Sequence, residues 1–244
     1  MSPQNAIARC AGLVYLLVVL TGIYSLLYVP AQLSAPGDAV EPIRHLAERA
    51  PLARSGLVVL LIDQLCFLIL PVLLYRLLSS TDRVAARLMV GLAWISVPLV
   101  LAAIAQRLGA VNLMSDPVLA NAIEMSQRQA LAIAAQRQYG NNLLMASIFW
   151  GLWLLPLGWL IWRSRRLPRV LGALLFVGGL GLVIDVIGKL MLPNWSEMAI
   201  AGYVTLPAAV GEIGACLYLL MFRSRPSNTM PLSSVDDSPA EPAS

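Results

Sequence analysis

The chain has 244 residues, of which 59% are hydrophobic and 12% are charged, and its formal net charge is +4. A soluble domain is roughly 45–50% apolar and about 25% charged, so this composition excludes an ordinary water-soluble protein. The positive charge does not indicate nucleic-acid binding, because the arginines stand at the ends of apolar runs and form no basic stripe.

Six apolar windows follow one another along the chain. A helix needs about 20 apolar residues to cross about 30 Å of hydrocarbon. Windows that meet this requirement lie at 10–29, 56–78, 87–106, 142–162, 168–192 and 198–222. We therefore predict an all-α polytopic membrane protein, a bundle of six transmembrane helices in contact with the lipid bilayer. The first window is longer than the 7–15 residues typical of the apolar region of a signal peptide, so we expect it to remain as a helix.

Two polar segments separate some of these windows. The segment 31–54 contains a Pro-Gly-Asp turn at 36–38 and a short helical stretch at 42–50. The segment 117–139 starts with a capping side chain before a proline and has helical apolar spacing, and it ends at Gly140 and Asn141. Because it is too polar to cross a bilayer, we predict an amphipathic surface helix between the third and fourth transmembrane helices.

The chain is predicted to divide at residue 225. Residues 1–225 form the six-helix transmembrane domain, whereas 226–244 are rich in proline and serine and contain few large apolar groups. Such a composition favours a disordered tail, which we expect on the cytoplasmic side.

A basic turn between the fourth and fifth windows predicts the orientation. It carries Arg163, Arg165, Arg166 and Arg169, and short basic loops are retained on the cytoplasmic side. Six crossings then place both termini in the cytoplasm. Sixteen of the seventeen basic residues are arginine, which favours a GC-rich bacterial genome, so we expect the protein in a bacterial inner membrane. The arginines on that side would be Arg9, Arg76, Arg83, Arg87, the four in the turn, Arg223 and Arg225. Those on the other side would be Arg44, Arg49, Arg54, Arg107, Arg128 and Arg137.

Apart from arginines within two residues of their ends, the apolar windows contain four charged residues, and these are Asp63, Asp185, Lys189 and Glu212. Each charged side chain costs roughly 2.5–3.5 kcal/mol at mid-membrane, so four that faced lipid would cost on the order of 12 kcal/mol. We therefore expect all four to face the interior of the bundle. Glu212 without a cation nearby would favour its neutral form, as a hydrogen-bond donor or proton carrier.

These residues, together with Gln64, are our candidate site for a small ligand, an ion or a proton. We expect the site to open toward the non-cytoplasmic side, covered by the 117–139 helix. A structural interpretation stays open beside this one. Asp185 and Lys189 are spaced i, i+4 and can neutralise each other, while Asp63, Gln64 and Glu212 can form hydrogen bonds between helices.

Motifs for catalysis, metals and cofactors are not found. His45 is the single histidine and lies in a polar segment, and Cys10, Cys66 and Cys216 are far apart. The glycines at 178, 179 and 181 lack the third glycine and the strand of a dinucleotide loop, so we interpret them as packing residues. Trp150 and Trp153 are expected to line the interior. No catalytic, cofactor-binding or metal-binding residue is predicted.

Several segments resemble one known family. They are FWGLWLLPLGWLIWRSRRLPRVLGALL (149–175), PVLLYRLL (71–78), APGDA (35–39) and AVGEIGACLYLL (209–220). Together they resemble the bacterial family called domain of unknown function 4386, over residues 9–222. The resemblance implies a six-helix integral membrane protein without an assigned activity. Its pattern places acidic residues at Asp38, Asp63, Asp185 and Glu212, whereas Lys189 has no counterpart in it.

We therefore interpret the chain as an integral membrane protein whose polar interior binds a small ligand, ion or proton. One alternative is a non-catalytic structural or accessory subunit in which the buried charges only set helix packing. A second alternative is a membrane-embedded enzyme acting on lipid, although the residues favour a protein that is not an enzyme. Assembly of two copies into a homo-oligomer is compatible with each of these functions.

Overall fold

The structure is built from helices. The computed structural model describes residues 3–33 and 41–221, and it contains no strand within these ranges. The long helices are α1 Pro3–Gly22, α4 Ala50–Leu78, α5 Arg83–Ser115, α7 Met125–Ser164, α8 Arg169–Met191 and α10 Leu206–Leu220. The shorter ones are η1 Ile23–Tyr28, α2 Val29–Leu33, α3 Glu41–Glu48, α6 Pro117–Ala122, η2 Trp195–Glu197 and α9 Ala199–Val204. Asp38, Arg223, Arg225 and the predicted tail 226–244 lie outside the described residues.

The predicted fold class is confirmed. Among the described residues, six segments are long and apolar enough to cross a membrane, and each matches one of the six windows. The first segment combines α1, η1 and α2, and the sixth combines α9 and α10. Large apolar side chains of these segments are exposed, among them Leu17 of α1, Leu65 of α4 and Ile187 of α8. Because lipid tails solvate such groups, these surfaces face the hydrocarbon.

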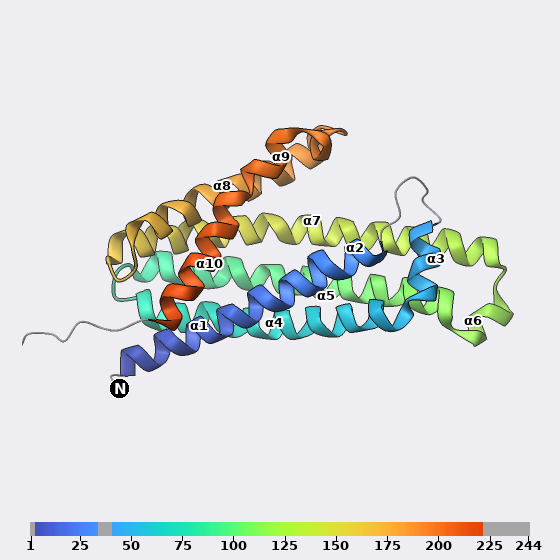
Figure 1. The fold of residues 1–244 in the computed structure, drawn as a ribbon, viewed down its shortest axis with the longest axis horizontal. Coiled ribbons are helices and arrows are strands. Elements are labelled where there is room, and N and C mark those ends of the chain that lie inside the picture. Colours follow the sequence, from blue (N-terminus) through green and yellow to red (C-terminus); the bar gives the residue numbers. More distant parts are fainter. Residues whose placement is uncertain (1–2, 34–40, 222–244) are drawn as a thin grey trace, which may run out of the picture.

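Figure 1 shows how the helices are arranged. α1, α4, α5 and α7 run along the long axis of the molecule, whereas α8 and α10 are inclined to it (Figure 1). The start of α1 and the end of α10 lie at the same end as the α4–α5 and α7–α8 connections (Figure 1). The main core lies toward this end, and its large buried side chains include Tyr15, Phe67, Met89, Trp153 and Leu157.

The segment 117–139 differs from its prediction. A helix does begin after Asp116, whose carboxylate accepts a hydrogen bond from the backbone N–H of Val118 at 2.8 Å. However, this helix ends at Ala122, and the rest of the segment is the first part of α7, which has 40 residues. At 1.5 Å per residue α7 is about 60 Å long, which is twice the thickness of the hydrocarbon core. The segment therefore extends the bundle along its axis instead of forming a separate surface helix (Figure 1).

Packing explains why α7 continues through Gly140 and Asn141. Glycine costs a helix only about 1 kcal/mol relative to alanine, which tertiary contacts readily offset. On either side of this pair, α7 buries Ala132, Tyr139 and Ala146 in clusters shared with other helices. α3 is the element that lies across this end of the bundle, and it buries Ile43 and Leu46 there (Figure 1).

Replacing Gly140 with alanine is expected to stabilise the protein by about 0.5–1 kcal/mol. A Cβ atom at Gly140 would meet no atom within 4 Å, so the substitution adds helix propensity without a clash. The free energy of unfolding, measured in mixed micelles with increasing dodecyl sulfate, checks this. Gly91→Ala in α5, which is equally unobstructed, is the control and should give a similar gain. A loss of stability for Gly140→Ala alone would mean that the helix ends at Gly140, as the sequence suggested.

Candidate functional site

A cavity of about 490 Å³ lies within the bundle between α1, α4, α7, α8 and α10. Both acidic side chains of the second and sixth spans, Asp63 and Glu212, line it. The remaining wall is mainly apolar and aromatic, with Phe67 from α4 and Trp150 and Trp153 from α7. The structure therefore brings together two of the acidic residues predicted to face the interior, and it confirms that the two tryptophans line it.

The carboxyl group of Asp63 accepts hydrogen bonds from uncharged side chains. Its side chain belongs to a residue only 5% exposed, near the midpoint of α4. Oδ1 accepts a hydrogen bond from the Thr21 hydroxyl at 2.7 Å, and Oδ2 accepts one from Nε2 of Gln64 at 2.8 Å. Gln64 therefore supports Asp63 and does not itself line the cavity. Its Oε1 atom is buried without a hydrogen-bond partner in the described structure.

The Thr21 hydroxyl allows Asp63 to exist in either protonation state. The hydroxyl oxygen lies 2.6 Å from the carbonyl oxygen of Leu17 and 2.7 Å from Asp63, but it has one proton to donate. When Asp63 is ionised, Thr21 donates to the carboxylate. When Asp63 is protonated, its own O–H donates to Thr21, which then donates to Leu17. Both arrangements leave the hydrogen bonds of Asp63 and Thr21 satisfied.

Glu212, on α10, has a similar environment. Its Oε1 accepts a hydrogen bond of 3.0 Å from the hydroxyl group of Tyr15, a side chain that is almost fully buried. Glu212 itself is half-buried and faces the cavity. Within the described ranges, neither Glu212 nor Asp63 takes part in an ion pair. The cavity thus presents two carboxyl groups whose own partners are all neutral.

Two interruptions of regular helix lie at the cavity. The first span changes from α-helix to the π-helix η1 after Gly22, and Gly22, Leu26 and Leu27 line the cavity. The sixth span breaks between α9 and α10 at Thr205, which also lines it. π-helical turns occur frequently at functional sites, and broken spanning helices are tolerated where they border a cavity.

Asp185 and Lys189 lie elsewhere, at the far end of α8. Oδ2 of Asp185 is 2.7 Å from Nζ of Lys189, and its Oδ1 accepts a hydrogen bond of 2.8 Å from the indole N–H of Trp195. Neither residue lines the cavity. The five predicted site residues therefore form two separate groups, with Asp63, Gln64 and Glu212 in one and this ion pair in the other. The cover expected from 117–139 is also absent, since no residue of that segment lines the cavity.

Sequence reasoning missed Tyr15 and Thr21, the donors to the two carboxyl groups. Both are polar side chains within an apolar window, which is the signal that singles them out. In the described ranges, no group of three or more His, Cys, Asp and Glu side chains is placed to hold a metal ion.

The fold and this cavity define a class, the polytopic α-helical membrane proteins with acidic side chains buried among their spans. The chain matches the family described as "Domain of unknown function (DUF4386)" over residues 10–222, and it belongs to that family. The resemblance seen in the sequence is thereby confirmed. No curated protein and no solved structure matches the chain.

Proposed function

We propose that the cavity binds a small, mainly apolar molecule that carries an amine or another cationic group. Its volume of about 490 Å³ falls within the roughly 300–1,000 Å³ typical of ligand pockets. Such pockets combine apolar walls with a few polar groups that orient the ligand. The single observation that carries the proposal is that Asp63 and Glu212 share this cavity without a basic partner among the described residues.

The side chains that line the cavity favour a ligand that combines a cationic group with a larger apolar part. Carboxylates form charge-assisted hydrogen bonds with ammonium groups, and aromatic rings attract cations through their faces. Phe67, Trp150 and Trp153 supply such rings beside the two acids. A hydrated metal ion would fit less well, because hard cations prefer several oxygen ligands at one point and these walls are largely carbon.

The opening of the cavity supports entry from the bilayer. α1 and α10 touch near Gly12, where a Cβ atom would lie 2.7 Å from the backbone nitrogen of Leu220. From this contact the two helices diverge (Figure 1). Leu27 on η1, which is 66% exposed, and Ala209 on α10, also exposed, lie in the wall between the cavity and the lipid-facing surface. An amphipathic ligand could therefore reach the acids from the hydrocarbon phase.

The experiment compares two probes of nearly equal shape and opposite charge, tetraphenylphosphonium and tetraphenylborate. Binding to the protein in nanodiscs is measured by equilibrium dialysis, with empty nanodiscs subtracted. We expect saturable binding of the phosphonium alone. The double variant Asp63→Asn with Glu212→Gln should bind it about 10–100-fold more weakly, because a carboxylate about 6 Å from the phosphonium charge attracts it by roughly 2–3 kcal/mol at an effective dielectric constant of about 20.

The control is Glu197→Gln, which removes one carboxylate from an exposed position on η2. This variant should bind the phosphonium like the unchanged protein. Equal binding of both probes, or unchanged binding by the double variant when it is folded, would contradict the proposal.

The orientation proposed for the chain is that of a bacterial inner-membrane protein with both termini in the cytoplasm. The end of the bundle that holds the start of α1 and the end of α10 also holds the basic α7–α8 turn (Figure 1). This arrangement supports a cytoplasmic location for that end, because arginines in short loops are retained there. The exposed arginines at this end are Arg76, Arg83, Arg87, Arg163, Arg165 and Arg169.

A further inference from the structure

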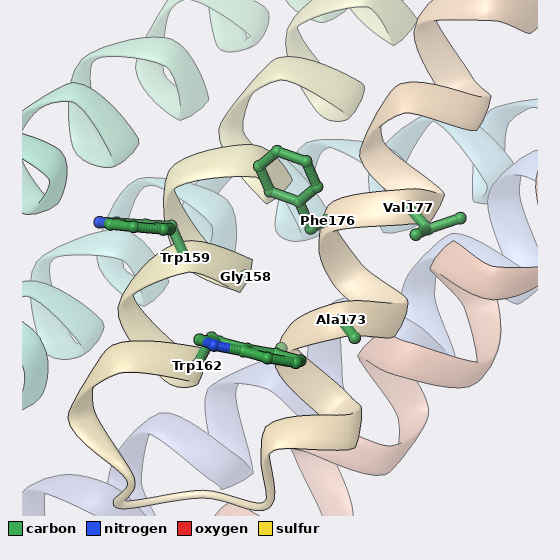
Figure 2. A pocket seen from close by; sticks show the side chains of 7 residues that line it. Gly158, Trp159, Trp162, Ala173, Phe176 and Val177 are labelled. Atoms are coloured by element: carbon green, nitrogen blue, oxygen red, sulfur yellow. The ribbon is translucent and has the colours of Figure 1, made fainter.

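A second apolar hollow, separate from the cavity of Asp63 and Glu212, lies on the outside of the α7–α8 hairpin. Its volume is about 290 Å³. Trp159 and Trp162 extend from α7 with their ring planes nearly parallel, and Phe176 and Val177 extend from α8 (Figure 2). All four side chains are between 40% and 55% exposed. We call this hollow the tryptophan groove.

The floor of the tryptophan groove is backbone. Gly158 of α7 and Gly172 of α8 face each other so closely that a Cβ atom on either would lie within 2.8 Å of the carbonyl oxygen of the other. The two helices therefore meet without side chains between them, and the larger side chains stand around the contact (Figure 2). The tryptophan groove is therefore narrow and apolar, and it is open to the surroundings of the bundle.

Arginine side chains border one end of the tryptophan groove. The guanidinium carbon of Arg169 lies 5.9 Å from the centroid of the Trp162 ring, which joins the charge directly to the apolar wall. Arg165 is exposed on the same turn, at a backbone φ of 53°. Neither arginine has an acidic partner in the described part of the chain.

The other two arginines of the turn are already engaged. Arg166 donates to the carbonyl oxygen of Leu77 at 3.0 Å and to the hydroxyl of Ser80 at 3.3 Å. Arg163 pairs with Asp82 at 3.4 Å. These bonds hold the turn against the α4–α5 connection, so the backbone that carries Arg165 and Arg169 is fixed in place.

We propose that the tryptophan groove binds one anionic phospholipid, with its phosphate at Arg165 and Arg169 and an acyl chain along Trp162 and Phe176. Charge complementarity selects this occupant, because two arginines that have no acidic partner among the described residues adjoin the apolar groove of a spanning hairpin. Arginine binds phosphate through paired hydrogen bonds, and basic pockets between spanning helices hold anionic headgroups. Tryptophan also favours the depth at which headgroups and chains meet. A zwitterionic lipid offers the same chains without the net negative charge.

The test is native mass spectrometry of the full chain in mild detergent, titrated with palmitoyl-oleoyl phosphatidylglycerol or the matching phosphatidylcholine. We expect the first phosphatidylglycerol to bind at least about tenfold more tightly than phosphatidylcholine, since each basic residue near the headgroups contributes about 1 kcal/mol. The double variant Arg165→Gln with Arg169→Gln should lose this preference. Trp162→Ala should weaken binding of long-chain phosphatidylglycerol while leaving the preference for anionic lipid.

The matched control is Arg76→Gln with Arg83→Gln, which removes the same charge from exposed positions of α4 and α5 at the same end of the molecule. This control should keep the preference. Equal affinity of the unchanged protein for both lipids would overturn the proposal, as would an equal loss of preference in the control pair. Competition by inorganic phosphate at the concentration of the lipid would also overturn it, because the site would then recognise a free anion without its chain.

Discussion

Alanine at position 178 is expected to destabilise the protein by about 1–3 kcal/mol, the usual cost of overpacking a core. A loss of stability is unusual for this substitution, because replacing glycine with alanine inside a helix normally stabilises a protein by about 1 kcal/mol. A Cβ atom on Gly178 would overlap the backbone nitrogen and Cα of Ala208, which belong to α10. Backbone atoms cannot move aside like the end of a flexible side chain, so α8 and α10 must separate.

The separation should also alter the binding site. Ala208 lines the cavity together with Glu212, which is four residues further along α10. We therefore expect Gly178→Ala to weaken tetraphenylphosphonium binding as well as stability. The measurement is unfolding in mixed micelles alongside the dialysis assay. Gly109→Ala is the control, because a Cβ atom at this position of α5 meets nothing within 4 Å. Equal stabilisation by both alanines would show that α8 and α10 are not in backbone contact.

The six spans could be predicted from the sequence because their signal is strong and additive. A window of about 20 apolar residues has few alternatives to a spanning helix, since unpaired backbone groups are costly in hydrocarbon. The insertion cost of charged groups also predicted that Asp63 and Glu212 face inward. These conclusions depend only on the cost of exposing polar or charged groups to hydrocarbon, which can be assessed for each helix separately. They need no knowledge of which helices are neighbours.

The grouping of the charged residues and the course of segment 117–139 depend on that knowledge. In the sequence, Asp185 and Asp63 are each the single acidic residue of an apolar window, yet only the folded chain shows that η2 returns to place the indole N–H of Trp195 against Asp185. Likewise, Gly140 and Asn141 are a sound local signal for a helix end, but packing of α7 along α5 overrides it. Tyr15 and Thr21 are visible in the sequence as polar side chains of an apolar window, but a phenol or hydroxyl group costs too little in a membrane to require a buried partner.

We expect the ion pair on α8 to stabilise the fold, and a second large effect on stability follows from this expectation. Replacing Asp185 with alanine is expected to cost about 2–3 kcal/mol of unfolding free energy. The indole N–H of Trp195, which is 8% exposed, would lose its acceptor, and a buried unsatisfied donor costs about 1–3 kcal/mol. Lys189 would lose its counter-ion, although its side chain is 41% exposed and can reach water, so its loss adds little.

Three further variants separate these contributions. Asp185→Asn retains an oxygen that accepts from Trp195, so we expect a smaller loss of about 1 kcal/mol. Lys189→Met alone should lower the free energy of unfolding more than the same change combined with Asp185→Asn, because the single change leaves a buried carboxylate without its cation. Unfolding in mixed micelles measures all four proteins, and the folded variants should still bind tetraphenylphosphonium because this pair lies outside the cavity. Loss of probe binding by Asp185→Asn at unchanged stability would instead join Asp185 functionally to Asp63 and Glu212.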